Sequence, residues 1–347
     1  MTIGLAIVGA GYWGPNLVRT ALATPALRLD WLCDLDVERA RTVLGAYTMV
    51  RPTDSYDAVL SDPDVAAVAI ATPAATHFDL IRSALEAGKH VLVEKPLTAA
   101  VAEAEKLTAL ARASGLALMC DHTYCYTPAV QHIRQLLRSG EIGEVQFIDS
   151  VRINLGLVQP DVDVLWDLAP HDLSILDFVL PEEIRPVAVA AHVGDPIGAG
   201  RACVAYLSLW LSNGALAHVH VNWLSPTKIR TTVFGGSRRT IVWDDTNPAA
   251  RLAVHDRGVD TLEARDVPQD QRRQALISYR TGDTLIPALP EREALLSVMT
   301  EFSSAITEGR PPLTDAEAGL RVLKLLAAAS RSVESGGSRI SLNGVGE

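Results

Sequence analysis

The sequence predicts an α/β protein of two domains, in which a parallel, doubly wound sheet is followed by an open, mostly antiparallel sheet packed on helices. Three observations support this fold class. The chain has 347 residues, which exceeds the size of one typical core. Short β-rich runs alternate with helical stretches up to about residue 119, and longer β-rich runs replace them after Thr127-Pro128. We therefore expect domains at residues 1–122 and 123–347.

Five short apolar runs are the predicted strands of the first domain. They are Ile3 to Val8, Leu27 to Cys33, Ala66 to Ala71, His90 to Val93 and Leu116 to Met119. Helices are predicted between them at Trp13 to Ala23, Thr76 to Ala87 and Ala99 to Ala113, the last two ended by Gly88 and Gly115. This alternation is typical of a parallel sheet with helices on both faces.

In the second domain, a helix at Ala129 to Arg138 precedes six predicted strands. These are Glu144 to Asn154, Ala188 to Val193, Cys203 to Trp210, Ala215 to Val221, Ile229 to Phe234 and Thr240 to Trp243. Asn213-Gly214 predicts a hairpin turn between two of them. The polar stretch Asp256 to Leu289 is interpreted as an irregular loop. Terminal helices are expected within residues 291–335, with a capping box that starts at Thr314.

Charge and composition narrow the classes of protein. The chain has 31 Lys and Arg against 41 Asp and Glu, a net charge of −10, which argues against a nucleic-acid partner. No apolar stretch approaches the roughly 18 residues of a membrane span, and no basic leader precedes the apolar start. The four cysteines lack C-x-x-C spacing, so we expect them to be reduced and buried in a cytoplasmic protein.

A glycine-rich turn follows the first predicted strand. Gly9, Gly11 and Gly14 fit G-x-G-x-x-G between a strand and a helix, the context in which this pattern binds a dinucleotide pyrophosphate. Asp34 ends the second strand, where a carboxylate accepts hydrogen bonds from the adenosine ribose. This favours NAD over NADP unless Arg39 or Arg41 compensates the charge of a 2′-phosphate. The alternative to the dinucleotide site is a glycine-rich turn that binds no ligand.

Two further turns end strands at the same predicted edge of the sheet. Thr72 and Pro73 end the strand before His77, and contact with the cofactor or a plain turn is equally consistent with their position. Lys95, after His90 to Val93, is placed where a lysine can exchange a proton with a substrate hydroxyl, and Pro96 restricts its backbone. A solvated lysine at a strand end is the alternative.

An acid and a histidine share a helix face in the second domain. Asp167 and His171 have i, i+4 spacing at the start of a predicted helix, so both side chains can reach one substrate. The alternative is that Asp167 is the N-cap and His171 a partly buried helix residue. His218 and His220 share one face of a strand, but no third ligand accompanies them, so we expect no metal.

Together these motifs resemble the Gfo/Idh/MocA family of NAD(P)-dependent oxidoreductases over essentially the whole chain. The resemblance implies a Rossmann domain, a second domain whose open sheet forms a dimer or tetramer interface, and a Lys95-Pro96 bond that can be cis. It implies proton transfer by Lys95 or His171, with Asp167 beside them. Expected cofactor contacts are Gly9, Gly11, Tyr12, Trp13, Gly14, Asp34, Thr72, Pro73, His77, Glu94 and Lys95. Expected substrate contacts are Lys95, Tyr126, Arg152, Asn154, Asp167 and His171.

The residues before Asp167 bear on the class of substrate that the sequence predicts. Polyol-oxidising members often have glycines there, whereas this chain has Asp163-Val164-Leu165-Trp166. With Arg152 and Asn154 on a preceding strand, this version resembles the branch that includes nucleotide-sugar 3-dehydrogenases. The sequence therefore predicts an NAD-dependent dehydrogenase or ketoreductase for a ring alcohol of a sugar, cyclitol or nucleotide sugar. Glycoside cleavage through transient oxidation and a non-catalytic cofactor sensor are the alternatives on this fold.

Overall fold

The computed structural model describes residues 2–47, 49–160, 162–261 and 277–342, and the chain divides into two compact units. Unit 1 comprises residues 1–128 and 291–324, and unit 2 comprises residues 129–290 and 325–347. The sequence assigned residues 291–324 to the second domain. They belong to unit 1 because helix α8 (Ala294–Glu308) contacts α1 (Gly14–Leu22) and the short helix η2 (Thr123–Tyr126).

Unit 1 contains a parallel sheet with the order β3-β2-β1-β4-β5-β6 among its described residues. The strands are β1 (Ile3–Val8), β2 (Leu27–Cys33), β3 (Arg51–Thr53), β4 (Ala67–Ile70), β5 (His90–Glu94) and β6 (Leu118–Asp121). The predicted doubly wound sheet is confirmed. The strand β3 was not predicted, because three residues that include Pro52 at a sheet edge give no apolar run.

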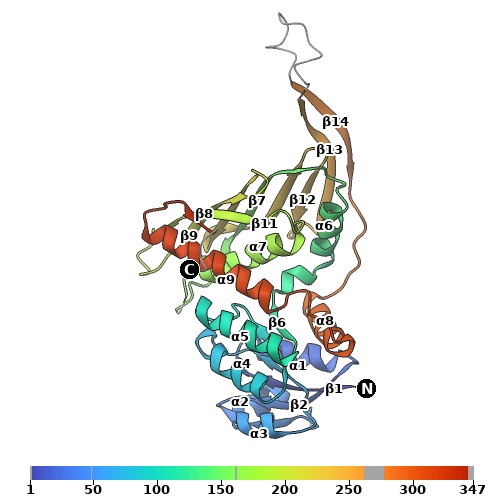
Figure 1. Cartoon of the computed structure of the whole chain (residues 1–347), viewed down its shortest axis with the longest axis vertical. Coiled ribbons are helices and arrows are strands. Elements are labelled where there is room, and N and C mark those ends of the chain that lie inside the picture. The colour runs from blue at the N-terminus through green and yellow to red at the C-terminus, as the bar shows by residue number, and fades with distance from the viewer. Residues whose placement is uncertain (1, 48, 161, 262–276, 343–347) are drawn as a thin grey trace, which may run out of the picture. The chain divides into compact units, whose positions relative to one another are not determined.

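Helices connect the strands of this sheet, as the alternation of strand and helix patterns in the sequence predicts. They are α1, α2 (Val37–Leu44), α3 (Tyr56–Ser61), α4 (His77–Glu86), preceded by η1 (Ala74–Thr76), and α5 (Val101–Ser114). The helices α4 and α5 lie side by side, and α1 contacts α2 (Figure 1). The strands between them are fully buried at Leu5, Ile7, Ile70 and Leu92, which makes the sheet the core of unit 1.

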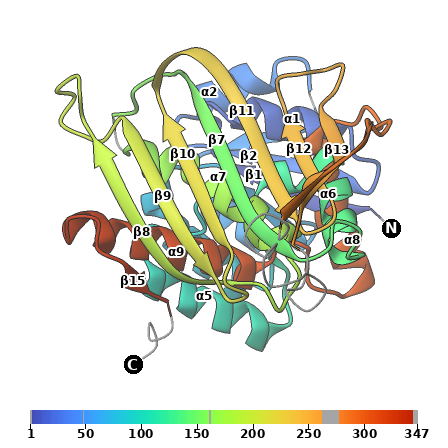
Figure 2. The same cartoon turned by 90° about the horizontal axis from the view of Figure 1, so that it is seen from above.

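Unit 2 contains a mixed, mostly antiparallel sheet with the order β14-β13-β12-β11-β7-β10-β9-β8-β15 among the described residues. The strands are β7 (Val145–Leu155), β8 (Pro186–Gly194), β9 (Val204–Leu211), β10 (Leu216–Asn222), β11 (Leu224–Gly236), β12 (Thr240–Asp244), β13 (Leu252–Thr261), β14 (Ile277–Leu285) and β15 (Ile340–Ser341). Figure 2 shows the central strands face on, with α7 (Val164–Val179) behind them. Helix α6 (Pro128–Arg138) precedes the sheet as predicted.

Two expectations for the later chain are wrong. The stretch interpreted as a loop at Asp256 to Leu289 contains most of β13 and all of β14, and its residues 262–276 lie outside the described part. Both strands carry polar side chains on each face, so alternation does not reveal them. Helix α9 (Ala316–Glu334) is capped by Asp315, whose carboxylate accepts the Ala318 N–H at 2.9 Å, while the hydroxyl of Thr314 donates to the Cys120 carbonyl.

Candidate active site

The glycine loop after β1 fits a bound pyrophosphate. Gly9 has φ +103°, and a Cβ there would lie 2.6 Å from the Ala71 carbonyl oxygen. A Cβ on Gly14 would lie 2.6 Å from the Gly9 carbonyl oxygen, so these two glycines are required by the fold itself. Gly11 has nothing within 4 Å of its Cβ position. It therefore leaves open space beside the N-terminus of α1, where backbone N–H groups attract an anion.

The two aromatic residues of this loop are accessible. Tyr12 is 88% exposed and Trp13 is 42% exposed, and their rings meet edge to face at 5.8 Å. Trp13 also occupies the N-cap position of α1. Their predicted contact with a cofactor remains a prediction, with surface available for it.

Asp34 connects the end of β2 to the glycine loop. Its carboxylate accepts the N–H of Ala10 at 2.6 Å and the N–H of Asp36 at 2.8 Å. Arg39 lies 3.7 Å from Asp34 and 3.4 Å from Asp36. Asp36 is the N-cap of α2, because its side chain accepts the Arg39 N–H. Asp34 is therefore held beside the glycine loop and does not cap α2, which is consistent with an acid that binds the ribose.

His77 joins two loops at the carboxyl edge of the sheet. Its Nδ1 lies 2.9 Å from the Pro96 carbonyl oxygen and its Nε2 lies 2.9 Å from the Thr72 carbonyl oxygen. The side chain is 1% exposed, and burial lowers the pKa of the imidazole. Thr72 and Pro73 form the turn before η1, where the Thr72 hydroxyl contacts that of Thr76 at 2.7 Å. This geometry favours a structural role for His77.

Lys95 directly follows β5, one strand away from β4 and two from β1 in the same sheet. The Lys95-Pro96 peptide bond is cis. Because parallel strands end at one edge, Lys95 lies at the same carboxyl edge as the glycine loop. Glu94 ends β5 and faces Asp121, the last residue of β6, a neighbour that the sequence analysis did not single out. The predicted strand, Leu116 to Met119, stops two residues before Asp121, so the sequence shows an acid near a strand end but not its pairing with Glu94.

Tyr126, a predicted substrate contact, lies in unit 1 and is 5% exposed. Its hydroxyl is 2.9 Å from that of Thr314, and burial raises the pKa of the phenol. This geometry favours packing over substrate contact.

In unit 2, Asp167 and His171 lie one turn apart on α7. The helix begins at Val164, and its N-cap is Asp163, whose carboxylate accepts the Trp166 N–H at 2.9 Å. The alternative that Asp167 caps the helix is therefore wrong. Asp167 instead accepts the Trp223 indole N–H at 3.1 Å, which fixes its carboxylate. The spacing leaves His171 on the same helix face as Asp167.

Arg152 on β7 has a different environment from the one a substrate contact needs. Its guanidinium is bidentate to Asp172 of α7, with distances of 2.8 and 3.2 Å, and the two side chains are 3% and 2% exposed. Ser150 donates to the same carboxylate at 2.9 Å and contacts Thr232 at 2.9 Å. The geometry favours a structural role for Arg152. Asn154, two residues further along β7, is partly buried, and its predicted substrate contact remains a prediction.

The remaining chemical groups do not form a metal centre in the described ranges. No cluster of three or more His, Cys, Asp or Glu side chains is found there that could hold an ion. His220 stacks on Tyr206 with ring centroids 4.4 Å apart, and His218 is 6.3 Å from Tyr206. The four cysteines are buried and form no disulfide. None of the helices in the described ranges is long and apolar enough to cross a bilayer.

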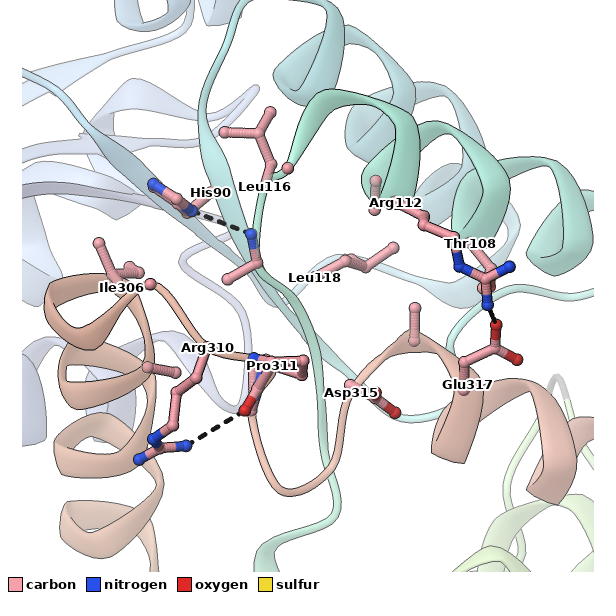
Figure 3. A pocket seen from close by; sticks show the side chains of 17 residues that line it. His90, Thr108, Arg112, Leu116, Leu118, Ile306, Arg310, Pro311, Asp315 and Glu317 are labelled. Carbon is pink, nitrogen blue, oxygen red and sulfur yellow. Dashed lines mark hydrogen bonds and ion pairs between the residues drawn. The ribbon is translucent and has the colours of Figure 1, made fainter.

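A pocket of about 420 Å³ lies in unit 1 at the amino-terminal end of β5, where His90 lines it (Figure 3). Its two arginines are paired with acids: Arg112 with Glu317, and Arg310 with Glu301 at 2.6 Å. Because β5 runs from His90 to Glu94, the pocket lies at the opposite end of the strand from Lys95. We therefore do not assign it to the chemical site.

A dinucleotide loop of this geometry, with a lysine at the same edge of the sheet, defines the class of protein: an NAD(P)-dependent oxidoreductase that acts on CH–OH groups. Residues 3–122 match the model of the oxidoreductase family with an NAD-binding Rossmann fold, and residues 130–241 match the GFO/IDH/MocA C-terminal domain. The chain therefore belongs to the GFO/IDH/MocA oxidoreductase family.

The chain is similar to several proteins of known name. It is 30% identical over 345 residues to UDP-N-acetylglucosamine 3-dehydrogenase of Acidithiobacillus ferrooxidans, which covers 95% of this chain and 96% of that protein. A solved structure of that enzyme matches with a TM-score of 0.80 at 27% identity, covering 97% and 100% of the two chains.

Two further solved structures share the fold and contain a dinucleotide. A protein of gentamicin A biosynthesis in complex with NAD matches with a TM-score of 0.79 at 24% identity, covering 99% and 97% of the chains. A mutant 3-ketoreductase of Actinomadura kijaniata in complex with NADP and TDP-benzene matches with a TM-score of 0.75 at 22% identity, covering 96% and 98%.

Proposed function

We propose that this chain is an NAD-dependent dehydrogenase or ketoreductase that acts on a ring secondary alcohol or ketone of a sugar-like substrate, with a nucleotide sugar favoured. The observation that carries the proposal is the position of Lys95 at the sheet edge that also ends in the Gly9 to Gly14 loop. The similarity to a UDP-N-acetylglucosamine 3-dehydrogenase over nearly the whole chain supports a nucleotide sugar.

Proton transfer is assigned to Lys95 and His171. The nicotinamide supplies or accepts the hydride when it is bound. During oxidation Lys95, uncharged, takes the proton from the reacting hydroxyl, and during reduction the ammonium returns it to the ketone oxygen. His171 is the second candidate for this step, and Asp167 binds a neighbouring hydroxyl from a carboxylate held by Trp223. That residues of both units act on one substrate is part of the proposal.

The preference for NAD rests on Asp34. A carboxylate at this place accepts ribose hydroxyls and repels a 2′-phosphate. The two arginines that would have to compensate are already paired with acids, Arg39 with Asp34 and Asp36, and Arg41 with Glu38. Binding of NADP therefore requires that one of these pairs opens.

Lys95→Ala tests the proposal directly. We expect turnover to fall by at least about 10²-fold, while the Kd for NAD changes little, because the proton acceptor is lost and the phosphate loop is intact. Lys106→Ala, which removes an exposed lysine from α5, is the matched control. The assay is NADH formation from a panel of nucleotide sugars, sugars and cyclitols, repeated with NADP.

Three outcomes would change the assignment. Full activity of Lys95→Ala would reject the lysine as proton acceptor. The absence of reduced cofactor with every substrate and both cofactors would reject the dehydrogenase. Release of free sugar from an aryl glycoside without net NADH would support cleavage through transient oxidation instead.

The open face of the unit 2 sheet is the proposed surface for a second copy of the chain. Leu216 and Phe147 are paired in register and are 45% and 42% exposed, and Tyr206 on the same face is 45% exposed. Apolar side chains adjacent on a sheet face are typical of an interface. Leu216→Glu should convert a dimer or tetramer to smaller species in light scattering, whereas a monomeric wild type would reject this surface.

A further inference from the structure

Two acidic residues end neighbouring strands beside Lys95. Glu94 is the last residue of β5, Asp121 is the last residue of β6, and the two are direct partners in the parallel register. Side chains of register partners on parallel strands project from the same face, so both carboxyl groups lie on one face of the sheet edge.

This carboxyl pair, Glu94 and Asp121, has an unusual environment. Asp121 is 2% exposed, and its Oδ1 accepts the Thr123 hydroxyl at 2.8 Å, whereas its Oδ2 has no hydrogen-bond partner among the described residues. Burial raises the pKa of Asp121 to about 6. Burial and the charge of Asp121 raise the pKa of Glu94 well above its ordinary value. Two adjacent carboxylates in such a place do not both ionise near neutrality.

The groups around the pair leave Lys95 as its principal charged neighbour. Burial and the charge of Lys95 lower the pKa of His122 to about 4, so that imidazole is neutral. Burial raises the pKa of the Cys120 thiol and of the Tyr126 phenol, so both are uncharged. Tyr126 in turn is influenced by Cys125 on η2 and by Glu301 on α8, the latter paired with Arg310.

We propose that Glu94 and Asp121 hold one proton between them, and that this pair sets the pH range in which Lys95 exchanges a proton with substrate. The shared proton supplies the hydrogen bond that Oδ2 of Asp121 lacks. The pair then carries a single negative charge that interacts through space with the charge of Lys95. Asp121 touches neither substrate nor cofactor in this scheme, so it is a positioning residue. The proton sharing concerns unit 1 alone, and only the effect on Lys95 rests on the proposed function.

Infrared difference spectra of the purified protein test the shared proton without any substrate. Wild type at neutral pH is expected to show the carbonyl stretch of a protonated carboxylic acid. Both Asp121→Asn and Glu94→Gln should shift or abolish it, because the proton loses the second carboxyl that shares it. Asp62→Asn is the control and should retain it, because Asp62 is bound by Arg51 and Trp31 and the pKa of its carboxyl is lowered. A wild type without the band, or a band that is unchanged in Asp121→Asn, would overturn the proposal.

The pH dependence of oxidation at saturating cofactor tests the effect on Lys95. Asp121→Asn should leave the acid limb of kcat/KM near its wild-type position, because one negative charge remains on Glu94. Glu94→Gln/Asp121→Asn removes that charge and should move the limb to lower pH by about two units, for charges about 6 Å apart at an effective dielectric of about 20. If the single variant moves the limb by about half as much as the double variant, both carboxyls were charged and the sharing is refuted. If no substrate is oxidised, the spectra still decide the proton count.

Discussion

Loss of one partner of the Arg152–Asp172 ion pair should destabilise unit 2 strongly. The two side chains are 3% and 2% exposed and are joined by two hydrogen bonds of 2.8 and 3.2 Å. Arg152→Met keeps most of the side-chain volume but leaves the Asp172 carboxylate buried without its cation, while the Ser150 hydroxyl still donates to it. Breaking a buried pair in this way costs about 3–5 kcal/mol. The expected fall in the thermal midpoint is roughly 6–20 °C.

Thermal and urea unfolding, followed by tryptophan fluorescence and circular dichroism, measure this cost. Arg41→Met is the matched control, because its pair with Glu38 is 60% and 72% exposed and such pairs contribute little. The double variant Arg152→Met/Asp172→Leu should recover most of the loss, since two apolar groups replace two buried charges. A stable Arg152→Met protein whose KM alone rises would refute the structural reading and support the substrate contact expected from the sequence.

Three further perturbations test the cofactor loop and the buried histidine. Gly14→Ala should destabilise unit 1, because its Cβ would lie 2.6 Å from a carbonyl oxygen. Gly11→Ala should keep the melting temperature and raise the Kd for NAD by about tenfold or more. Equal losses of melting temperature in the two variants would contradict this expectation. Asp34→Ser should shift the ratio of NADP to NAD affinity toward NADP by about tenfold or more, measured by fluorescence titration, and an unchanged ratio would count against Asp34 as the selective residue. Because the pKa of His122 falls from the ordinary 6.5 to about 4 on folding, its contribution to stability is present above pH 6.5 and is lost as the pH falls toward 4. His122→Phe should remove about 3 kcal/mol from the change in the free energy of unfolding over this pH range, as measured by urea titrations at a series of pH values. The same dependence of that free energy on pH in wild type and variant would refute the expectation.

The strands and the loop of unit 1 could be predicted because their signals are local. An apolar run such as Ile3–Val8 buries both faces, and the glycines that follow it are required at fixed positions by backbone contacts. The strands β13 and β14 could not be predicted in this way. Their side chains at Arg257, Arg280 and Asp283 are polar, so the pairing that forms them depends on a neighbouring strand rather than on alternation.

The candidate site was predicted in the parts that depend on spacing and missed in the parts that depend on contact. The i, i+4 pair Asp167 and His171 lies on one helix as expected. Arg152 was placed on the correct strand, but only the structure shows that Asp172 occupies its guanidinium. The carboxyl pair was missed because Asp121 is distant from Glu94 in sequence, and the register of two parallel strands is not encoded by either strand alone.

The environment of His77 has a consequence for the two loops that it joins. Both of its ring nitrogens face carbonyl oxygens at 2.9 Å, but a neutral imidazole carries a single N–H. The ring can therefore donate to the Thr72 carbonyl or to the Pro96 carbonyl, and the other oxygen then faces a lone pair. The choice of tautomer decides which turn is held: the one beside the predicted cofactor contacts or the one that carries Lys95. Only the imidazolium form would hold both, and burial of this side chain opposes that form.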